Sequence, residues 1–202
     1  MKRVRTAAAL AAICSGWGQA SLAATQPGQI QASGVYVHRG SGFSFPEALG
    51  EFRRVAVIQY NADATDISAG YNLDQPARRV AVTVYVYPAP LAEGQSSQER
   101  VCSDQFDSIK SDVQHAHPGA RVVAETSVAS PDPGYDKIGR KAVYEFQDVF
   151  AGKPQPLRSE ADLYCYVAGP WFVAYRTTAP RDTDYVPELQ RLMRQLRWPP
   201  KE

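Results

Sequence analysis

The stretch that decides the fold is RVAVTVYVY, residues 79–87, in which a valine stands at every second position. Successive side chains of an extended strand point to opposite faces. The valines therefore share one face, and Tyr85 and Tyr87 share the other with Ala81 and Thr83. This alternation predicts a central strand of a sheet.

Shorter alternating segments lie on both sides of this strand in the sequence. Residues 52–60 and 66–72 precede it, and the turn-prone residues 61–65 between them predict a hairpin. After it, turns rich in Pro and Gly separate further candidate strands. These three or four strands are expected within residues 121–129, 139–150, 157–167 and 171–178.

Two segments have the spacing of amphipathic helices. Ser96 and Glu99 have the spacing of a capping box, so the first helix is expected to begin at Ser96 and to end before Pro118. Its apolar face would carry Cys102, Phe106, Ile109 and Val113. A second helix is expected over residues 184–197, with an apolar face of Leu189, Leu192, Met193 and Leu196.

The order of these elements, strands, helix, strands and helix, predicts an α+β fold. We expect an antiparallel sheet of about six or seven strands with two helices packed on it. This order, together with Phe43-Ser44-Phe45-Pro46 and Tyr85-Val86-Tyr87-Pro88, resembles the Mog1/PsbP-like fold. It is also similar to uncharacterised secreted proteobacterial proteins that open the same way. The resemblance implies a non-catalytic binding or assembly factor.

The N-terminus predicts secretion. Residues 1–23 combine a basic start, an apolar stretch and a small-residue cleavage site after Ala23, which is typical of a signal peptide. A lipoprotein signal at Cys14 is the alternative, but Ile13 stands where a small residue is expected. Residues 24–34 lack periodicity and are expected to form a flexible leader before a single domain, residues 35–202.

Composition limits the classes of function. The 202 residues are 44% hydrophobic and 21% charged, which predicts one globular domain rather than a disordered or multi-pass membrane chain. Removal of residues 1–23 would leave 19 Lys and Arg against 21 Asp and Glu. Because nucleic acids are bound through concentrated positive charge, they are not expected partners. No integral membrane segment is expected in the mature chain.

Cys102 and Cys165 would be the cysteines left after cleavage, in an oxidising compartment. Each falls on the apolar side of its predicted element, so we expect a disulfide across a helix–sheet interface. The alternative is a redox dithiol, which the sequence does not favour because it lacks a Cys-x-x-Cys motif.

Tyrosine is the unusual feature, with 11 residues in the chain. Tyr85 and Tyr87 share one strand face, as do Tyr164 and Tyr166, and the four would make a recognition face if their strands were neighbours. Charged residues at 158, 160 and 162 on the second strand favour its partial exposure. The alternative is that a helix or loop covers this face, or that tyrosine simply suits strands.

Residues for chemistry are sparse. No nucleophile elbow, phosphate-binding loop or zinc-helix motif occurs in the sequence. His115 and His117 are two residues apart at a predicted helix end, a spacing that does not suit a shared metal. We therefore name no catalytic residue, metal or cofactor.

The sequence favours a secreted or periplasmic, non-catalytic module that binds an envelope protein or another envelope component. Two alternatives remain open at this point. One is a small envelope hydrolase whose residues meet only in the fold. The other is a carrier of a small apolar ligand in a cavity between helix and sheet.

Overall fold

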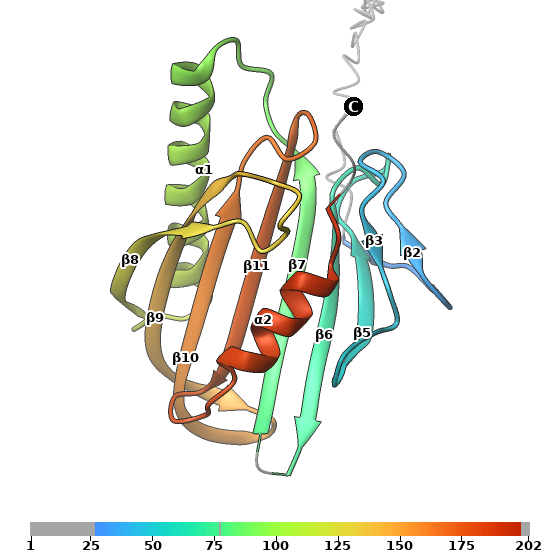
Figure 1. Ribbon diagram of the computed structural model, residues 1–202. Coiled ribbons are helices and arrows are strands. Elements are labelled where there is room, and N and C mark those ends of the chain that lie inside the picture. The colour runs from blue at the N-terminus through green and yellow to red at the C-terminus, as the bar shows by residue number, and fades with distance from the viewer. Residues whose placement is uncertain (1–26, 77, 199–202) are drawn as a thin grey trace, which may run out of the picture.

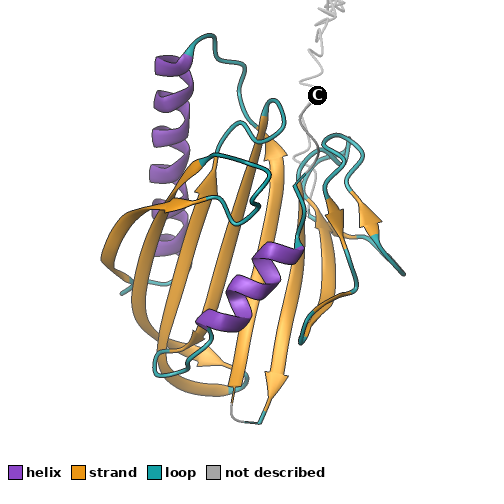
Figure 2. Cartoon of the chain, in the orientation of Figure 1, coloured by secondary structure: helices purple, strands orange, loops and turns teal. Residues whose placement is uncertain are grey.

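A computed structural model describes residues 27–76 and 78–198, and within them the chain forms a nine-stranded antiparallel sheet with a helix on each face (Figure 1). The strand order is β1-β5-β6-β7-β11-β10-β9-β8, and β4 pairs with β5 outside this path. The described residues form mainly sheet with two helices, so the fold is α+β as predicted (Figure 2). The long strands are β5 (Phe52–Gln59), β6 (Ile67–Gln75), β7 (Arg78–Pro88), β8 (Arg121–Ala129), β9 (Ile138–Phe150), β10 (Lys153–Tyr164) and β11 (Trp171–Pro180).

The sheet is larger than the six or seven strands that were predicted. The additional strands are β1 (Gly28–Gln29) and β4 (Ala48–Leu49), two residues each, which both pair with β5. Strands this short carry no readable alternation, so sequence patterning missed them. A separate two-stranded sheet joins β2 (Tyr36–Val37) to β3 (Ser44–Phe45).

β7 is a central strand, as its alternation predicted, because it pairs with β6 on one side and β11 on the other. Its four valines lie in a buried cluster with aromatic residues of β6, β10 and β11. The helix α2 (Val186–Gln195) covers this face with buried Leu189, Leu192 and Met193. In Figure 1, α2 crosses in front of the central strands.

The opposite face carries the longer helix α1 (Gln95–Ala116), which lies behind the sheet near β9 and β10 (Figure 1). Its buried residues are Phe106 and Val113, which pack with residues of β9, β10 and β11. The predicted capping box is absent: the helix begins at Gln95, its N-cap is Gly94, and no side chain caps it. Gly94 has a φ of 75°, which glycine adopts without strain.

β10 begins four residues earlier than predicted, at Lys153 rather than 157. Ala151 and Gly152 both have positive φ and turn the chain tightly from β9 into β10. The prolines at 154 and 156 fit in the strand because there β10 pairs with β9 but not yet with β11, whose register begins at Leu157. Proline is tolerated at such edge positions.

The residues before Val35 do not form the free leader that was expected. Gly28 and Gln29 pair with β5, and the Ile30 N–H donates to the Val57 carbonyl at 2.8 Å. The Arg54 guanidinium also donates to the carbonyls of Ala32 and Gly34. The described residues 27–34 therefore belong to the folded domain, while the predicted signal peptide, residues 1–23, and residues 24–26 lie outside the described part.

Among residues 27–76 and 78–198, neither helix has the length and apolar character needed to cross a bilayer.

Candidate functional site

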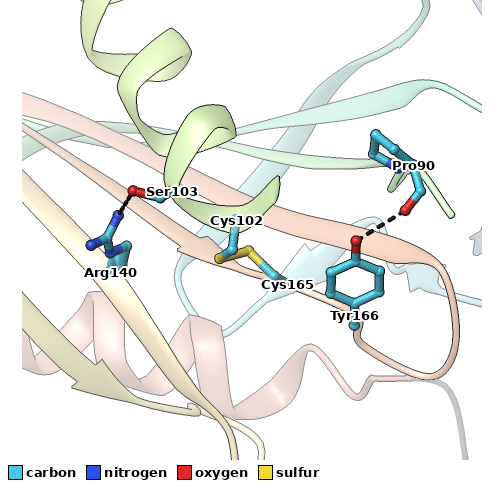
Figure 3. The surroundings of a disulfide bond; sticks show 6 residues. All are labelled: Pro90, Cys102, Ser103, Arg140, Cys165 and Tyr166. Atoms are coloured by element: carbon cyan, nitrogen blue, oxygen red, sulfur yellow. Dashed lines mark hydrogen bonds between the residues drawn. A yellow bond between two sulfur atoms is a disulfide. The ribbon is translucent and has the colours of Figure 1, made fainter. Parts of the chain in front are cut away.

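Cys102 and Cys165 form a disulfide in the structure (Figure 3). Their Cα atoms lie 5.9 Å apart, and the bond connects α1 to the turn after β10. One residue further along α1, the Ser103 hydroxyl accepts a 2.9 Å hydrogen bond from Arg140 on β9. The first half of α1 is thus held to the sheet by a covalent bond and a polar contact.

The four tyrosines of the predicted recognition face do not come together. β11 lies between β7 and β10, so the two pairs are not on neighbouring strands. Tyr85 and Tyr87 lie on the α1 face, partly exposed. Tyr164 lies on the α2 face, buried against Tyr175 and Trp198.

Tyr166 does not share a face with Tyr164 because β10 ends at Tyr164. Tyr166 stands in the following turn with a φ of 53°, which breaks the alternation. Its ring packs at 6.1 Å from Phe172, and its hydroxyl donates to the Pro90 carbonyl at 2.9 Å (Figure 3). Of the four tyrosines, Tyr85, Tyr87 and Tyr166 therefore pack on the α1-side cluster, where Tyr87 and Tyr166 contact the same Phe172 ring.

Of the three charged residues expected to be partly exposed on β10, Glu160 and Asp162 are buried, whereas Arg158 is partly exposed. The Glu160 carboxylate accepts hydrogen bonds from Lys141 at 2.6 Å and from the Tyr185 hydroxyl at 2.9 Å. Asp162 lies 3.5 Å from the same Lys141 amine and is 2% exposed. Burial raises the pKa of Asp162 from 3.8 to about 6.

Lys141 and Asp162 line a cavity of about 270 Å³ between α2 and the end of β8. Lys141 and Glu160 are paired with each other, and Tyr185, just before α2, is tied to Glu160. The network thus holds α2 on the sheet. The sequence favoured partial exposure of Glu160 and Asp162, because no pattern within β10 indicates that α2 covers it.

A cleft of about 280 Å³ opens on the other face, between α1 and the sheet. Tyr60, Tyr85 and Tyr87 are its aromatic lining, and Arg176 lies on its sheet side. The helix contributes the residues that complete the lining on its side, which are Gln105, Ile109 and Asp112.

Small side chains on the sheet leave the room for this cleft. Arg176 is flanked in register by Ala161 on β10 and Thr83 on β7. One strand further on each side are Ala142 and Gly70. Short side chains surround one long cationic side chain, so the cleft has a floor that no neighbouring residue fills.

The tyrosines form a connected aromatic surface. The ring centroids of Tyr60 and Tyr85 are 6.4 Å apart, and the Tyr60 hydroxyl lies 3.0 Å from the Ser68 hydroxyl. Tyr87 packs at 5.3 Å from Phe172. Burial raises the pKa of both Tyr85 and Tyr87, so their hydroxyls stay protonated at neutral pH.

The Arg176 side chain has no ion pair or hydrogen bond with any residue of the described part of the chain, and its Nη2 atom is buried. The Tyr144 hydroxyl on the same face of the sheet is also buried without a partner there. Burial raises the pKa of Tyr144 to about 12, and the nearby Arg176 charge acts in the opposite direction. Sequence reasoning missed Arg176, although a lone arginine in the otherwise uncharged strand WFVAYRTTAP was a visible signal.

The cleft lining carries aromatic, amide, carboxylate and guanidinium groups. Within the described residues, its lining includes no serine, cysteine or histidine. His115 and His117 lie elsewhere, at the end of α1, where His117 Nδ1 is 2.7 Å from Asp148 Oδ2 and its ring stacks on Phe146. No cluster of three metal-binding side chains occurs in the part of the chain that is described.

Comparison with known proteins adds no assignment to this geometry. No protein-family model matches the chain, and no curated protein is significantly similar to it. The geometry of the cleft is therefore the basis for proposing a function.

Proposed function

We propose that this protein is a secreted, non-catalytic binding module that takes a small ligand in the cleft between α1 and the sheet. The observation that carries the proposal is the cleft lined by Tyr60, Tyr85 and Tyr87 beside an unpaired Arg176. A small-molecule site is usually a concave pocket of apolar and aromatic side chains with a few placed polar groups. This lining sets tyrosine rings beside Gln105, aspartates and Arg176. Its volume of about 280 Å³ suits a ligand of about one ring.

Secretion is part of the proposal. The signal-peptide pattern of residues 1–23 supports it, and a disulfide between Cys102 and Cys165 is the kind of bond that persists in an oxidising compartment. We also propose that the fold is Mog1/PsbP-like, from the aromatic motifs at 43–46 and 85–88. That resemblance implies a binding or assembly factor.

The cleft is favoured over a flat tyrosine surface as the place of binding. Tyr164 is buried beneath α2 and does not extend the surface of Tyr85 and Tyr87. Tyr166 packs on the same Phe172 ring as Tyr87, but its hydroxyl is bound to the Pro90 carbonyl and it does not line the cleft. An envelope hydrolase receives less support, because the cleft lining in the described residues lacks a nucleophile of the serine or cysteine type.

The test is native mass spectrometry of the protein isolated from the envelope of its own cells. We expect a non-covalent extra mass on the wild type that is absent from the Tyr85→Ala/Tyr87→Ala variant. Tyr36→Ala is the matched control, because Tyr36 is a partly exposed tyrosine on the separate β2–β3 sheet. The control should keep the extra mass.

Two results would contradict the proposal. The extra mass could persist in the cleft variant, which would place the ligand elsewhere. Alternatively, the wild type could carry no small molecule and instead retain a protein partner that the Tyr85→Ala/Tyr87→Ala variant retains equally. That outcome would point to the sheet edges and loops as the place where the partner binds.

A further inference from the structure

We propose that Arg176 anchors an anionic group, a carboxylate or a phosphate, on a ligand whose ring lies against Tyr60, Tyr85 and Tyr87. This inference rests on the proposed function, since it names the chemistry of the ligand that the same cleft would bind. It makes Arg176 the residue that selects the ligand by charge.

The first support is the unbalanced charge. The other partly buried arginines of the described residues have acceptors: Arg78 pairs with Glu188 at 2.7 Å, Arg54 donates to backbone carbonyls, and Arg158 lies 3.4 Å from Glu160. The Arg176 side chain has no such partner in the described residues, and although the residue is partly exposed, its Nη2 atom is buried. A guanidinium nitrogen withdrawn from water needs an acceptor to compensate for its lost hydration. Its planar donors match the oxygens of a carboxylate or phosphate.

A second unsatisfied donor lies on the same face. The Tyr144 hydroxyl is buried without a hydrogen-bond partner in the described chain, and Arg176 is close enough to act on its titration. Buried polar groups are nearly always hydrogen-bonded, so a pair of orphan donors beneath one helix is unusual. The Tyr144 hydroxyl is not part of the lining of the cleft, so an anionic ligand there would supply its oxygen acceptors to Arg176.

The aromatic wall adjoins this donor site. Tyr85 is two residues along β7 from Thr83, the partner of Arg176, and its ring centroid lies 6.4 Å from that of Tyr60. Tyrosine rings offer flat apolar area and a polar tip at low entropic cost. A ligand with a ring and an attached anion would fill the wall and the donor site together.

Three aspartates line the cleft, and one of them, Asp162, is almost fully buried and ion-paired with Lys141. The other two, Asp66 and Asp112, both act electrostatically on Tyr87. Tyr87 is four residues along β7 from Thr83, the partner of Arg176, which is about 13 Å of strand at the usual rise per residue. Negative charge at that end would repel the anionic group and direct it toward Arg176.

The experiment compares three rings of nearly equal shape, benzoate, benzamide and benzamidine, which are anionic, neutral and cationic. Binding is followed by amide chemical shifts in nuclear magnetic resonance, which also report the location. We expect benzoate to bind in the cleft at least about tenfold more tightly than the other two probes. Arg176→Gln should abolish this preference, and Arg176→Lys should retain part of it.

Arg79→Gln is the matched control. Arg79 is an exposed arginine at the start of β7 that pairs with Asp74 at 2.9 Å, so its loss removes the same charge away from the cleft. The control should bind benzoate like the wild type. Circular dichroism of each variant, with an intact disulfide, establishes that it has folded.

The outcomes separate this inference from the proposed function. If benzamide or benzamidine binds in the cleft as tightly as benzoate, the cleft is a binding site but the anionic assignment is wrong. Benzoate binding that survives Arg176→Gln would likewise overturn the role of Arg176. If none of the probes binds at millimolar concentration, the inference fails, and the extra mass on the isolated protein decides the proposed function separately.

Discussion

The two faces of the sheet are covered in opposite ways. The ten-residue α2 buries three of its side chains in a cluster that includes the β7 valines and several aromatic rings. The 22-residue α1 buries two side chains and leaves Tyr85 and Tyr87 partly exposed. The shorter helix buries more of its side chains, while the longer helix leaves the tyrosines of its face partly exposed beside a cleft.

The manner of attachment differs as well. α2 is held by apolar packing and by the hydrogen bond from Tyr185 to Glu160, whereas α1 is held by the Cys102–Cys165 disulfide and a small apolar contact. A covalent link positions a helix without requiring that all of the sheet beneath it be filled with side chains. Both faces keep a cavity of similar volume, so the comparison teaches that the stapled face differs in its lining: the Arg176 side chain lacks an acceptor among the described residues, whereas Lys141 and Asp162 form an ion pair on the packed face.

The largest expected effect concerns the staple. The Cys102→Ala/Cys165→Ala variant should lose about 4 kcal/mol of unfolding free energy, because the bond closes a loop with a sequence separation of 63 residues. Urea unfolding measures this loss, and hydrogen exchange should show faster exchange in α1 than in α2. Equal protection of both helices in the variant would contradict the difference between the faces.

Next, truncation should cost more on the packed face. Leu192 on α2 is 1% exposed, and Leu192→Ala should destabilise the fold by about 3 to 4 kcal/mol through lost burial and a cavity. Ile109 on α1 is only partly buried, so Ile109→Ala is the matched comparison and should cost about 1 kcal/mol. Urea unfolding of the two variants gives both numbers. Similar costs would mean that the two helices pack alike.

The buried carboxylate of the packed face predicts a pH effect. Burial raises the pKa of Asp162 from 3.8 to about 6, so the folded chain binds more protons there than the unfolded chain between these values. The contribution of Asp162 to stability therefore falls as the pH rises through this window. Relative to the wild type, Asp162→Asn should be about 2 to 3 kcal/mol more favourable at pH 8 than at pH 4.

Urea unfolding at several pH values measures this difference. Asp148→Asn is the control, because Asp148 is an exposed carboxyl whose pKa is lowered by hydrogen bonds from the Val149 N–H and His117. Its substitution should have a pH dependence of the opposite sign. If the difference in unfolding free energy between Asp162→Asn and the wild type did not change with pH, burial would not raise the pKa of Asp162.

The smallest effects concern two tyrosine hydroxyls. Tyr164→Phe removes a hydrogen bond to the Ala129 carbonyl on the packed face and should cost about 1.5 kcal/mol. Tyr166→Phe removes a more exposed bond to the Pro90 carbonyl and should cost about 0.5 kcal/mol. Thermal unfolding resolves the order of the two, and the reverse order would break the comparison.

Periodicity predicted much of this fold and little of its site. The valine alternation of 79–87 identified the central strand, and the apolar spacing identified α2. These patterns are local, so they can be read without knowing which elements meet. The pairing of Cys102 with Cys165 could be expected because few alternatives existed.

The site depends on contacts between distant segments. Which strands neighbour each other decided that Tyr85 and Tyr164 lie on opposite faces, and no pattern within either strand contains that information. Arg176 became a candidate only when its register placed Ala161 and Thr83 beside it. The burial of Glu160 and Asp162 likewise follows from where α2 docks.

The most direct test of the central claim is a crystal structure of the protein isolated from the envelope of its own cells. We predict electron density for a small molecule between α1 and the sheet, in contact with Tyr85 and Tyr87 and with an acceptor group at Arg176. Density for a ligand on the α2 face, or side chains of α1 packed over Tyr85 and Arg176 so that the cleft is filled, would contradict the account.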